Sequence, residues 1–188
     1  MAALNLTTDS RFLSEALGTG AYTLKCLYLG SRDGFTYEKL SDRCKDASPA
    51  FIFVRTEKGI RFGAFTSVAL VSEGPKWIGD QKAFIVSLTH RTKHRVIPEK
   101  SDKALLHLGP MQASDWLALF GEGRDLAIAS EGGLSQANLG FGYELPLGLE
   151  YRSNESKTYL GGEISFKVVE VEVYQVFFRD YFETRELM

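Results

Sequence analysis

The stretch that decides the fold is Lys157-Thr-Tyr-Leu-Gly-Gly-Glu-Ile-Ser-Phe-Lys-Val-Val-Glu-Val-Glu-Val-Tyr-Gln-Val176. Around Phe166, apolar and polar residues alternate with the period of a half-buried β-strand. The phase then slips by one residue, because valines now alternate with Glu170 and Glu172. A shift of one residue would move every later side chain to the opposite face of the sheet, so we expect a β-bulge near Val168–Val169. We also expect the two glutamates to face solvent and the strand to close a sandwich or curved sheet.

Composition describes an ordinary globular protein. The chain has 188 residues, of which 44% are hydrophobic and 24% charged, and its net charge is −2. This balance favours a single mainly β (α+β) domain over residues 1–188, with a core of about 10–178 and a tail at 179–188. Neither nucleic acid binding nor attraction to an anionic membrane is expected at this charge.

The chain also lacks the sequence features of membrane and secreted proteins. Its apolar stretches are too short to span a bilayer, so we expect no membrane insertion. The first residues have no basic segment followed by an apolar run, as a signal peptide would. Two cysteines, Cys26 and Cys44, suit a reducing compartment better than a disulfide scaffold. We therefore expect a cytoplasmic protein.

Two short helices are expected near the start. The first covers Asp9–Leu17, with Asp9 or Ser10 as its cap and Gly18 as its stop. The second begins after Thr36 as N-cap, with Phe35 and Leu40 at the positions of a hydrophobic staple. Cys44 then lies on the packing face of this helix, which indicates a buried thiol.

Strands dominate from Ala50 onward, and no helix of ten or more residues alternates with them. This order favours antiparallel pairing over a parallel α/β sheet. The expected segments are a hairpin of Phe51–Arg55 and Ile60–Val71, a second of Lys82–Thr89 and Arg95–Ile97 around a solvated basic tip at His90–His94, strands at Leu117–Phe120 and Asp125–Ala129, and a long ordered loop over 130–149. The side chains expected in the core are Phe51, Phe53, Phe84, Val86, Phe166 and Val171.

The usual catalytic and metal-binding patterns are missing from the sequence. It has no phosphate-binding loop, no dinucleotide-binding glycine motif and no nucleophile elbow. His90 and His94 flank Arg-Thr-Lys, whose cations would repel a metal ion. Cys26 and Cys44 have no further ligands at useful spacing, and their apolar surroundings disfavour a peroxide-consuming thiolate. We expect no catalytic residue, no metal and no cofactor.

The segment Ser31-Arg-Asp-Gly-Phe35 joins a strand that ends at Leu29 to the second helix. Its Asp-Gly pair is typical of a tight turn. Two interpretations stay open. Ser31 and Asp33 could satisfy backbone donors at the helix entrance while Arg32 pairs with a carboxylate, or these residues could contact a partner.

Five pieces of sequence, taken in order, resemble the TLDc domain, the module found beside TBC and LysM domains and in oxidation-resistance proteins. The resemblance covers about residues 10–178. It implies a two-sheet antiparallel β-sandwich with short flanking helices and no established catalytic centre. It also implies a link to oxidative-stress resistance and binding to the vacuolar-type proton ATPase, whose assembly or activity such domains influence. The pieces are Leu27–Phe35, Phe62–Ser67, Asp80–Leu88, Phe120–Ile128 and Thr158–Tyr174.

We therefore expect a non-catalytic protein-interaction domain that regulates such an ATPase. The alternative is a structural component of a large cytoskeletal or ciliary assembly. Loops at strand ends present polar side chains on a rigid scaffold, and arginine pairs bidentately with carboxylates. The competing interpretation is that Arg32 and Arg124 bind their own neighbours. The expected partner contacts are Ser31, Arg32, Asp33, Gly34 and Phe35, together with Arg124 and Asp125 of the Gly121–Asp125 turn.

Overall fold

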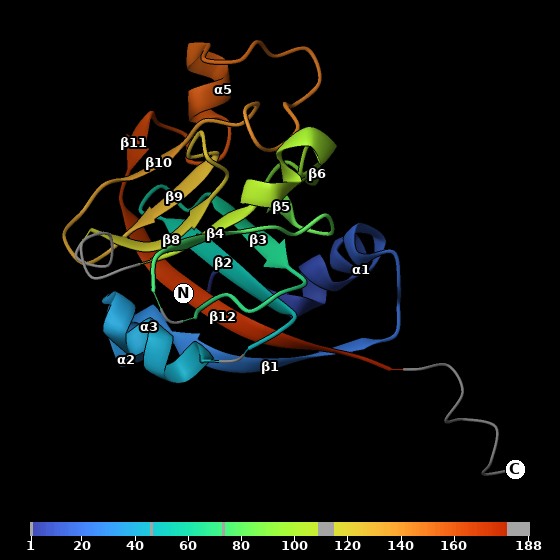
Figure 1. Ribbon diagram of the computed structural model, residues 1–188, viewed down its shortest axis with the longest axis vertical. Coiled ribbons are helices and arrows are strands. Elements are labelled where there is room, and N and C mark those ends of the chain that lie inside the picture. Colours follow the sequence, from blue (N-terminus) through green and yellow to red (C-terminus); the bar gives the residue numbers. More distant parts are fainter. Residues whose placement is uncertain (1, 46, 73, 109–114, 180–188) are drawn as a thin grey trace, which may run out of the picture.

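The protein is an antiparallel β-sandwich. The computed structural model describes residues 2–45, 47–72, 74–108 and 115–179. Two six-stranded sheets pack face to face, and short helices lie at their sides (Figure 1). The predicted mainly β (α+β) class and the two-sheet antiparallel architecture are therefore confirmed.

All neighbouring strands in both sheets run antiparallel. The first sheet has the order β1 (Tyr22–Leu29), β12 (Val168–Phe178), β2 (Ala50–Thr56), β3 (Arg61–Thr66), β5 (Phe84–Ser87) and β6 (Thr92–Arg95). The second has the order β11 (Ser165–Phe166), β10 (Ser135–Ala137), β9 (Leu126–Ala129), β8 (Trp116–Phe120), β7 (Leu105–His107) and β4 (Lys76–Ile78).

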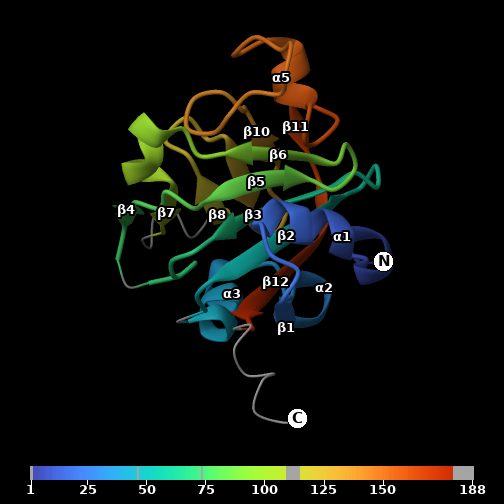
Figure 2. The same cartoon turned by 90° about the vertical axis from the view of Figure 1, so that its right-hand side faces the viewer.

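Helices cover the outer face of the first sheet and close the sides of the sandwich. The longest, α1 (Leu6–Leu17), lies across the first sheet below β5 and β6 (Figure 2). The short α2 (Gly30–Asp33) and α3 (Tyr37–Cys44) follow β1, and α3 contacts both β1 and β8. A 3-10 helix, η1 (Pro98–Lys103), follows β6, and α5 (Asn154–Thr158) precedes β11.

The core has two main parts. An inner cluster fills the space between the sheets and includes Phe62, Phe120 and Phe166. An outer cluster lies between the first sheet and α1, where Leu13 and Ala16 pack on phenylalanines. All six side chains that the sequence placed in the core are buried: Phe51, Phe53, Phe84, Val86, Phe166 and Val171.

The expected bulge is confirmed, but the expected exposure of the two glutamates is wrong. The register of β12 against β2 shifts between Val168 and Glu170. The run is nevertheless not one strand, because Phe166 lies in β11 of the second sheet and the chain changes sheet before Val168. Glu172 is only 1% exposed, because its carboxylate accepts hydrogen bonds from the backbone nitrogens of Ala3 (2.6 Å) and Leu4 (3.2 Å). Glu170 is buried as well. A buried carboxylate is tolerated when backbone N–H groups donate to it. The alternation of valine and glutamate therefore did not show which face of the strand is exposed to solvent.

The start of α1 also differs from the prediction. Asn5 is the N-cap, and its side chain accepts from the backbone nitrogen of Thr7. Asp9 is fully buried and pairs with Arg61 (2.6 Å) and Arg91 (2.8 Å), so it ties α1 to the first sheet. The other predicted helix signals hold: Gly18 ends α1 in the left-handed conformation, and Thr36 caps α3.

Two strand predictions need correction. The second hairpin turns over residues 88–91, so β6 begins at Thr92 and includes much of the expected basic tip. His94 is 2% exposed and points into the protein instead of facing solvent. The expected loop over 130–149 is ordered, and it contributes β10 to the second sheet. Apart from Arg179, the expected tail at 179–188 lies outside the described residues.

Candidate functional site

The Ser31–Phe35 segment bonds mainly to its own surroundings. The Glu170 carboxylate accepts from the backbone nitrogen of Ser31 (3.0 Å) and from the Ser31 hydroxyl. The Asp33 carboxylate accepts from the backbone nitrogen of Leu29 (3.0 Å) and from Nε (2.9 Å) and Nη2 (2.6 Å) of Arg32. Asp33 and Arg32 thus match the interpretation in which the segment bonds to its own neighbours at the helix entrance. Ser31 differs from it, because its hydroxyl donates to Glu170 and does not accept from a backbone donor.

Arg32, and Arg43 of α3, present the exposed positive charges beside the covered Asp33 carboxylate. The hydrogen bond from Arg32, together with Arg43 at 3.4 Å, lowers the pKa of Asp33 to about 2. The Asp33 carboxylate is thus ionised and almost entirely covered, whereas the Arg32 side chain is 51% exposed. A partner would meet guanidinium groups whose charge is already partly neutralised.

Phe35 anchors the same segment to the second sheet. Its ring packs against the inner cluster, and its carbonyl oxygen accepts from the backbone nitrogen of Glu131 (2.8 Å). A β-carbon at Gly30 would lie 2.5 Å from this ring, so glycine is needed there. Gly34, with φ 98°, forms the turn between the end of α2 and Phe35. Phe35 thus has a packing role that accounts for its position.

The structure assigns Asp125 to the interior rather than to a contact surface. Its carboxylate is fully buried and accepts hydrogen bonds from four successive backbone nitrogens, those of Gly140, Phe141, Gly142 and Tyr143 (2.9–3.1 Å). Burial raises the pKa of Asp125, and the four backbone donors oppose that rise. Asp125 therefore holds the 140–143 loop in place, and its side chain does not reach a partner.

Arg124 is exposed, but the structure does not bring it beside the first turn. Its guanidinium lies 5.3 Å from the centre of the Trp116 ring. Arg124 precedes β9, whereas Phe35 bonds to Glu131, which follows β9. The two predicted turns therefore lie at opposite ends of that strand. Whether Arg32 and Arg124 contact a partner stays a prediction.

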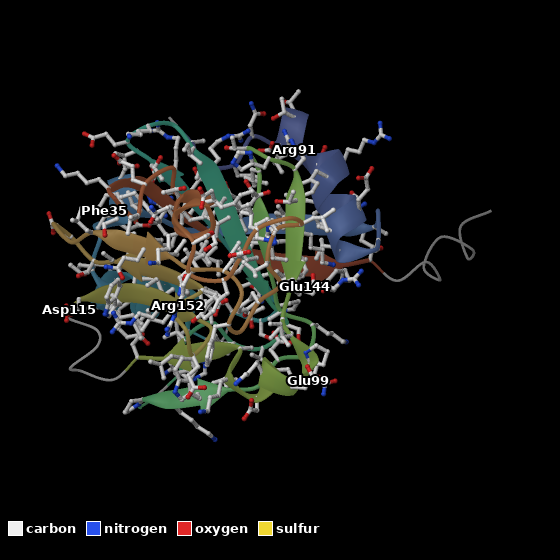
Figure 3. All side chains as sticks on the ribbon, turned by 90° about the horizontal axis from the view of Figure 1, so that it is seen from above. Phe35, Arg91, Glu99, Asp115, Glu144 and Arg152 are labelled. Carbon is white, nitrogen blue, oxygen red and sulfur yellow. The ribbon has the colours of Figure 1, made fainter. Side chains whose placement is uncertain are left out.

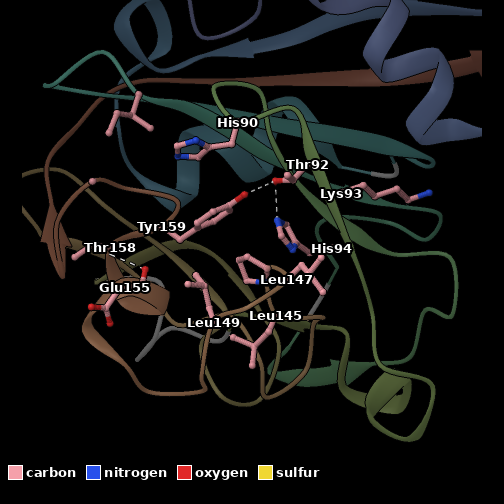
Figure 4. Close-up of a pocket in the computed structure, with 13 residues that line it drawn as sticks. His90, Thr92, Lys93, His94, Leu145, Leu147, Leu149, Glu155, Thr158 and Tyr159 are labelled. Carbon is pink, nitrogen blue, oxygen red and sulfur yellow. Dashed lines mark hydrogen bonds between the residues drawn. The ribbon is translucent and has the colours of Figure 1, made fainter.

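A cleft that the sequence did not reveal lies between β6, the 145–149 loop and α5 (Figure 4). Its volume is about 880 Å³. Apolar surface exceeds polar surface in its wall, and a few polar groups converge within it, which is the usual composition of a binding site. The main lining residues are Ile60, His90, Thr92, His94, Leu145, Leu147, Leu149 and Tyr159.

The polar groups of this cleft form a chain with a defined direction. His94 Nδ1 lies 3.1 Å from the carbonyl oxygen of Glu144, which can only accept, so Nδ1 carries the proton. Burial lowers the pKa of His94 to about 4, so the ring is neutral and Nε2 accepts from the Thr92 hydroxyl (2.9 Å). Thr92 in turn accepts from the Tyr159 hydroxyl (2.9 Å). The chain fixes the orientation of Tyr159, on whose ring His90 stacks at 4.7 Å.

The aliphatic wall carries a leucine that is completely exposed. Leu149 N donates to the carbonyl of Pro146 (3.1 Å), and Gly148 has φ 81°, so residues 146–149 form a tight turn. Leu147 occupies the outer corner of this turn and contributes its whole side chain to the surface. Leu145, by contrast, packs against the inner cluster and anchors the loop.

The cleft and the predicted contact segment are distinct surfaces. Glu144, which borders the cleft, and Phe35 lie well apart when the molecule is seen from above (Figure 3). The only sequence signal for the cleft was Leu-Pro-Leu-Gly-Leu at 145–149, inside a segment without periodicity. Its other walls come from residues 60, 90–94 and 155–162, which no local motif connects.

The buried histidine predicts a pH dependence of stability. The pKa of His94 is about 4 in the folded protein against an ordinary value of 6.5, so the unfolded chain binds the proton first as pH falls. The free energy of unfolding should therefore decrease by about 3 kcal/mol between pH 6.5 and pH 4 through this group. Chemical unfolding of wild type and His94→Gln at several pH values measures it. Equal slopes in the two proteins would contradict the assignment.

Two features are absent from the part of the chain that the structure describes. Nowhere in ranges 2–45, 47–72, 74–108 and 115–179 do three or more His, Cys, Asp or Glu side chains come together as metal ligands would. In the same ranges, no helix has the length and apolar character needed to cross a membrane.

Comparison with known proteins gives the family. A comparison with curated proteins found no match. The family described as TLDc domain matches residues 6–177, from the start of α1 almost to the end of β12. The match thus includes the sandwich, the Ser31–Phe35 segment and the cleft. The chain belongs to the TLDc domain family.

Proposed function

We propose that this TLDc domain is a non-catalytic docking module, and that its partner is a vacuolar-type proton ATPase whose assembly or activity it regulates. Family membership supports this class of partner and a link to oxidative-stress resistance. The docking takes place in the cytoplasm, as composition predicts.

The observation that carries the docking proposal is the fully exposed Leu147 beside the aliphatic cleft. Leu147 adjoins the apolar lining of the cleft, and contiguous exposed apolar surface of this kind is typical of interaction sites. Tyr159 adds an aromatic surface whose orientation is fixed by Thr92, so little conformational entropy is lost on binding. A partner side chain seated in the cleft would be flanked by Leu147 and Tyr159.

The state of the cysteines supports a role other than thiol chemistry. Burial raises the pKa of Cys44 to about 12, and burial also raises the pKa of Cys26. Neither thiol is therefore a ready nucleophile near neutral pH. We expect iodoacetamide to modify exposed Cys26 in the native protein and to modify Cys44 only after unfolding. Mass spectrometry of the alkylated peptides measures this order, and faster reaction at Cys44 would contradict it.

Affinity capture tests the proposed partner. The tagged chain, expressed in its natural cells, is purified at moderate salt and the bound proteins are identified. Recovery of cytoplasmic subunits of a proton-pumping ATPase is the expected result. Recovery of cytoskeletal or ciliary proteins without ATPase subunits would contradict the regulatory proposal and favour the structural alternative.

A further inference from the structure

A second cleft lies where α1 ends and the outer face of the first sheet continues beyond it. Its volume is about 640 Å³. The helix stops at Leu17, because Gly18 adopts the left-handed conformation that ends it. The surface next to the last turn of α1 is therefore left open between β5, β6 and the end of β12, the region that Figure 2 turns toward the viewer.

The floor of this cleft is aromatic. Phe65 and Phe84 stack with ring centres 4.9 Å apart, and both are almost completely buried. At the rim, Phe178 leaves 48% of its surface exposed. The floor can therefore receive an aromatic or aliphatic side chain without rearranging the packed core.

The charged residues that line the cleft are all cations: Lys82, Lys93 and Arg95. Lys93 is held in place, since its ammonium donates to the carbonyl of Ala16 and lies 4.3 Å from the centre of the Phe84 ring. Burial, and then the positive charge of Arg95, lower the pKa of Lys93, and the negative charge of Glu144, outside the lining, opposes this shift. The three cations are thus gathered without a compensating carboxylate in the lining.

Two of these cations are available to a ligand. The side chains of Lys82 and Arg95 are exposed, and neither occurs in an ion pair with a carboxylate in the described parts of the chain. Glu144 approaches Arg95 from outside the lining, and its carboxylate accepts from the backbone nitrogen of Arg95 at 3.0 Å. Among the residues that the structure describes, the guanidinium of Arg95 has no hydrogen-bond acceptor, so its donors are open to a ligand.

We propose that this cleft binds an acidic peptide segment of a partner protein, with carboxylates on Lys82 and Arg95 and one apolar side chain on the Phe65–Phe84 floor. Carboxylates form charge-assisted hydrogen bonds with guanidinium and ammonium groups. The positive charge is local, because the whole chain has a net charge of −2 and so lacks the extended basic surface that nucleic acids require. The site is separate from the Leu147 cleft, although Lys93 borders both.

Fluorescence anisotropy of the full chain tests this proposal directly. The probe is a labelled peptide with the sequence Asp-Glu-Asp-Phe-Glu-Leu-Asp-Glu. Wild type should bind it saturably at low salt, and added salt should weaken the binding. The double variant Lys82→Glu with Arg95→Glu should bind at least about tenfold more weakly. A peptide with serine in place of its Phe and Leu should also lose at least about fivefold in affinity.

A matched pair of charge reversals serves as the control. Lys25→Glu on β1 and Lys39→Glu on α3 change the net charge equally at exposed positions outside the cleft, and should leave the affinity within about twofold. Thermal unfolding verifies that all variants are folded. Absence of saturable binding, equal weakening by the control pair, or equal binding of the serine peptide would overturn the proposal. Binding of a single-stranded oligonucleotide in place of the peptide would overturn it as well.

Discussion

Replacing Asp125 by alanine is expected to lower the free energy of unfolding by about 3–5 kcal/mol. The carboxylate is fully buried and accepts from four backbone nitrogens of residues 140–143. Alanine removes this acceptor and leaves the buried backbone nitrogens of Gly142 and Tyr143 without the hydrogen bonds that Asp125 accepts, whereas Gly140 keeps a second acceptor in the carbonyl of Tyr143 (2.9 Å).

Urea unfolding of the variant measures this loss. Asp42→Ala provides the control, because Asp42 is exposed on α3 and its removal should change stability by less than about 0.5 kcal/mol. Similar stability of the Asp125 and Asp42 variants would show that the 140–143 loop does not depend on this carboxylate. Partner binding in the folded fraction should persist, because the Asp125 side chain is not at the surface.

Replacing Phe166 by alanine should cost about 3–5 kcal/mol. This side chain lies between the sheets with 1% of its surface exposed, and its ring packs edge-on against Phe62 at 5.5 Å between centres. A β-carbon at Gly161 would come within 1.9 Å of the ring, so the chain is closely fitted around it. The cavity left by alanine cannot be filled without moving that backbone.

The comparison for this variant is Phe177→Ala, which removes a ring that is 45% exposed at the end of β12. We expect the Phe177 variant to lose less than about 1.5 kcal/mol. Denaturant unfolding of the two proteins measures the difference. A loss at Phe166 no larger than the loss at Phe177 would mean that the inner cluster can collapse around the missing ring.

The strands were predictable because their signal is local. Alternation after Val168 gave the position of β12, and the slip in phase gave the position of its bulge. The same pattern did not show that Phe166 belongs to β11 of the other sheet, because the change of sheet leaves no local signal. Which residues cover each face of a strand depends on contacts between distant parts of the chain. Glu172 is buried by Ala3 and Leu4, residues about 170 positions away, and periodicity holds no information about them.

The functional surfaces were hard to predict for the same reason, because they depend on contacts between residues far apart in the sequence. The Ser31–Phe35 turn was recognised as a strand-to-helix connection, and its internal bonds followed one of the two interpretations that the sequence left open. Asp125 could not be placed from its neighbours, because its partners lie in a loop 15 to 18 residues later. The Leu147 cleft is formed by four separate parts of the chain, at residues 60, 90–94, 145–149 and 155–162, so only the fold reveals it.

The central claim is that the domain acts by docking through the cleft beside Leu147. Its most direct test is the yield of ATPase subunits captured by Leu147→Asp relative to wild type. The matched control is Leu134→Asp, since Leu134 is also exposed, at 49%, but lies outside the cleft lining. We predict a loss of at least about tenfold for the Leu147 variant, with an unchanged melting temperature, and less than about twofold for the control. Equal capture by both variants would contradict the account.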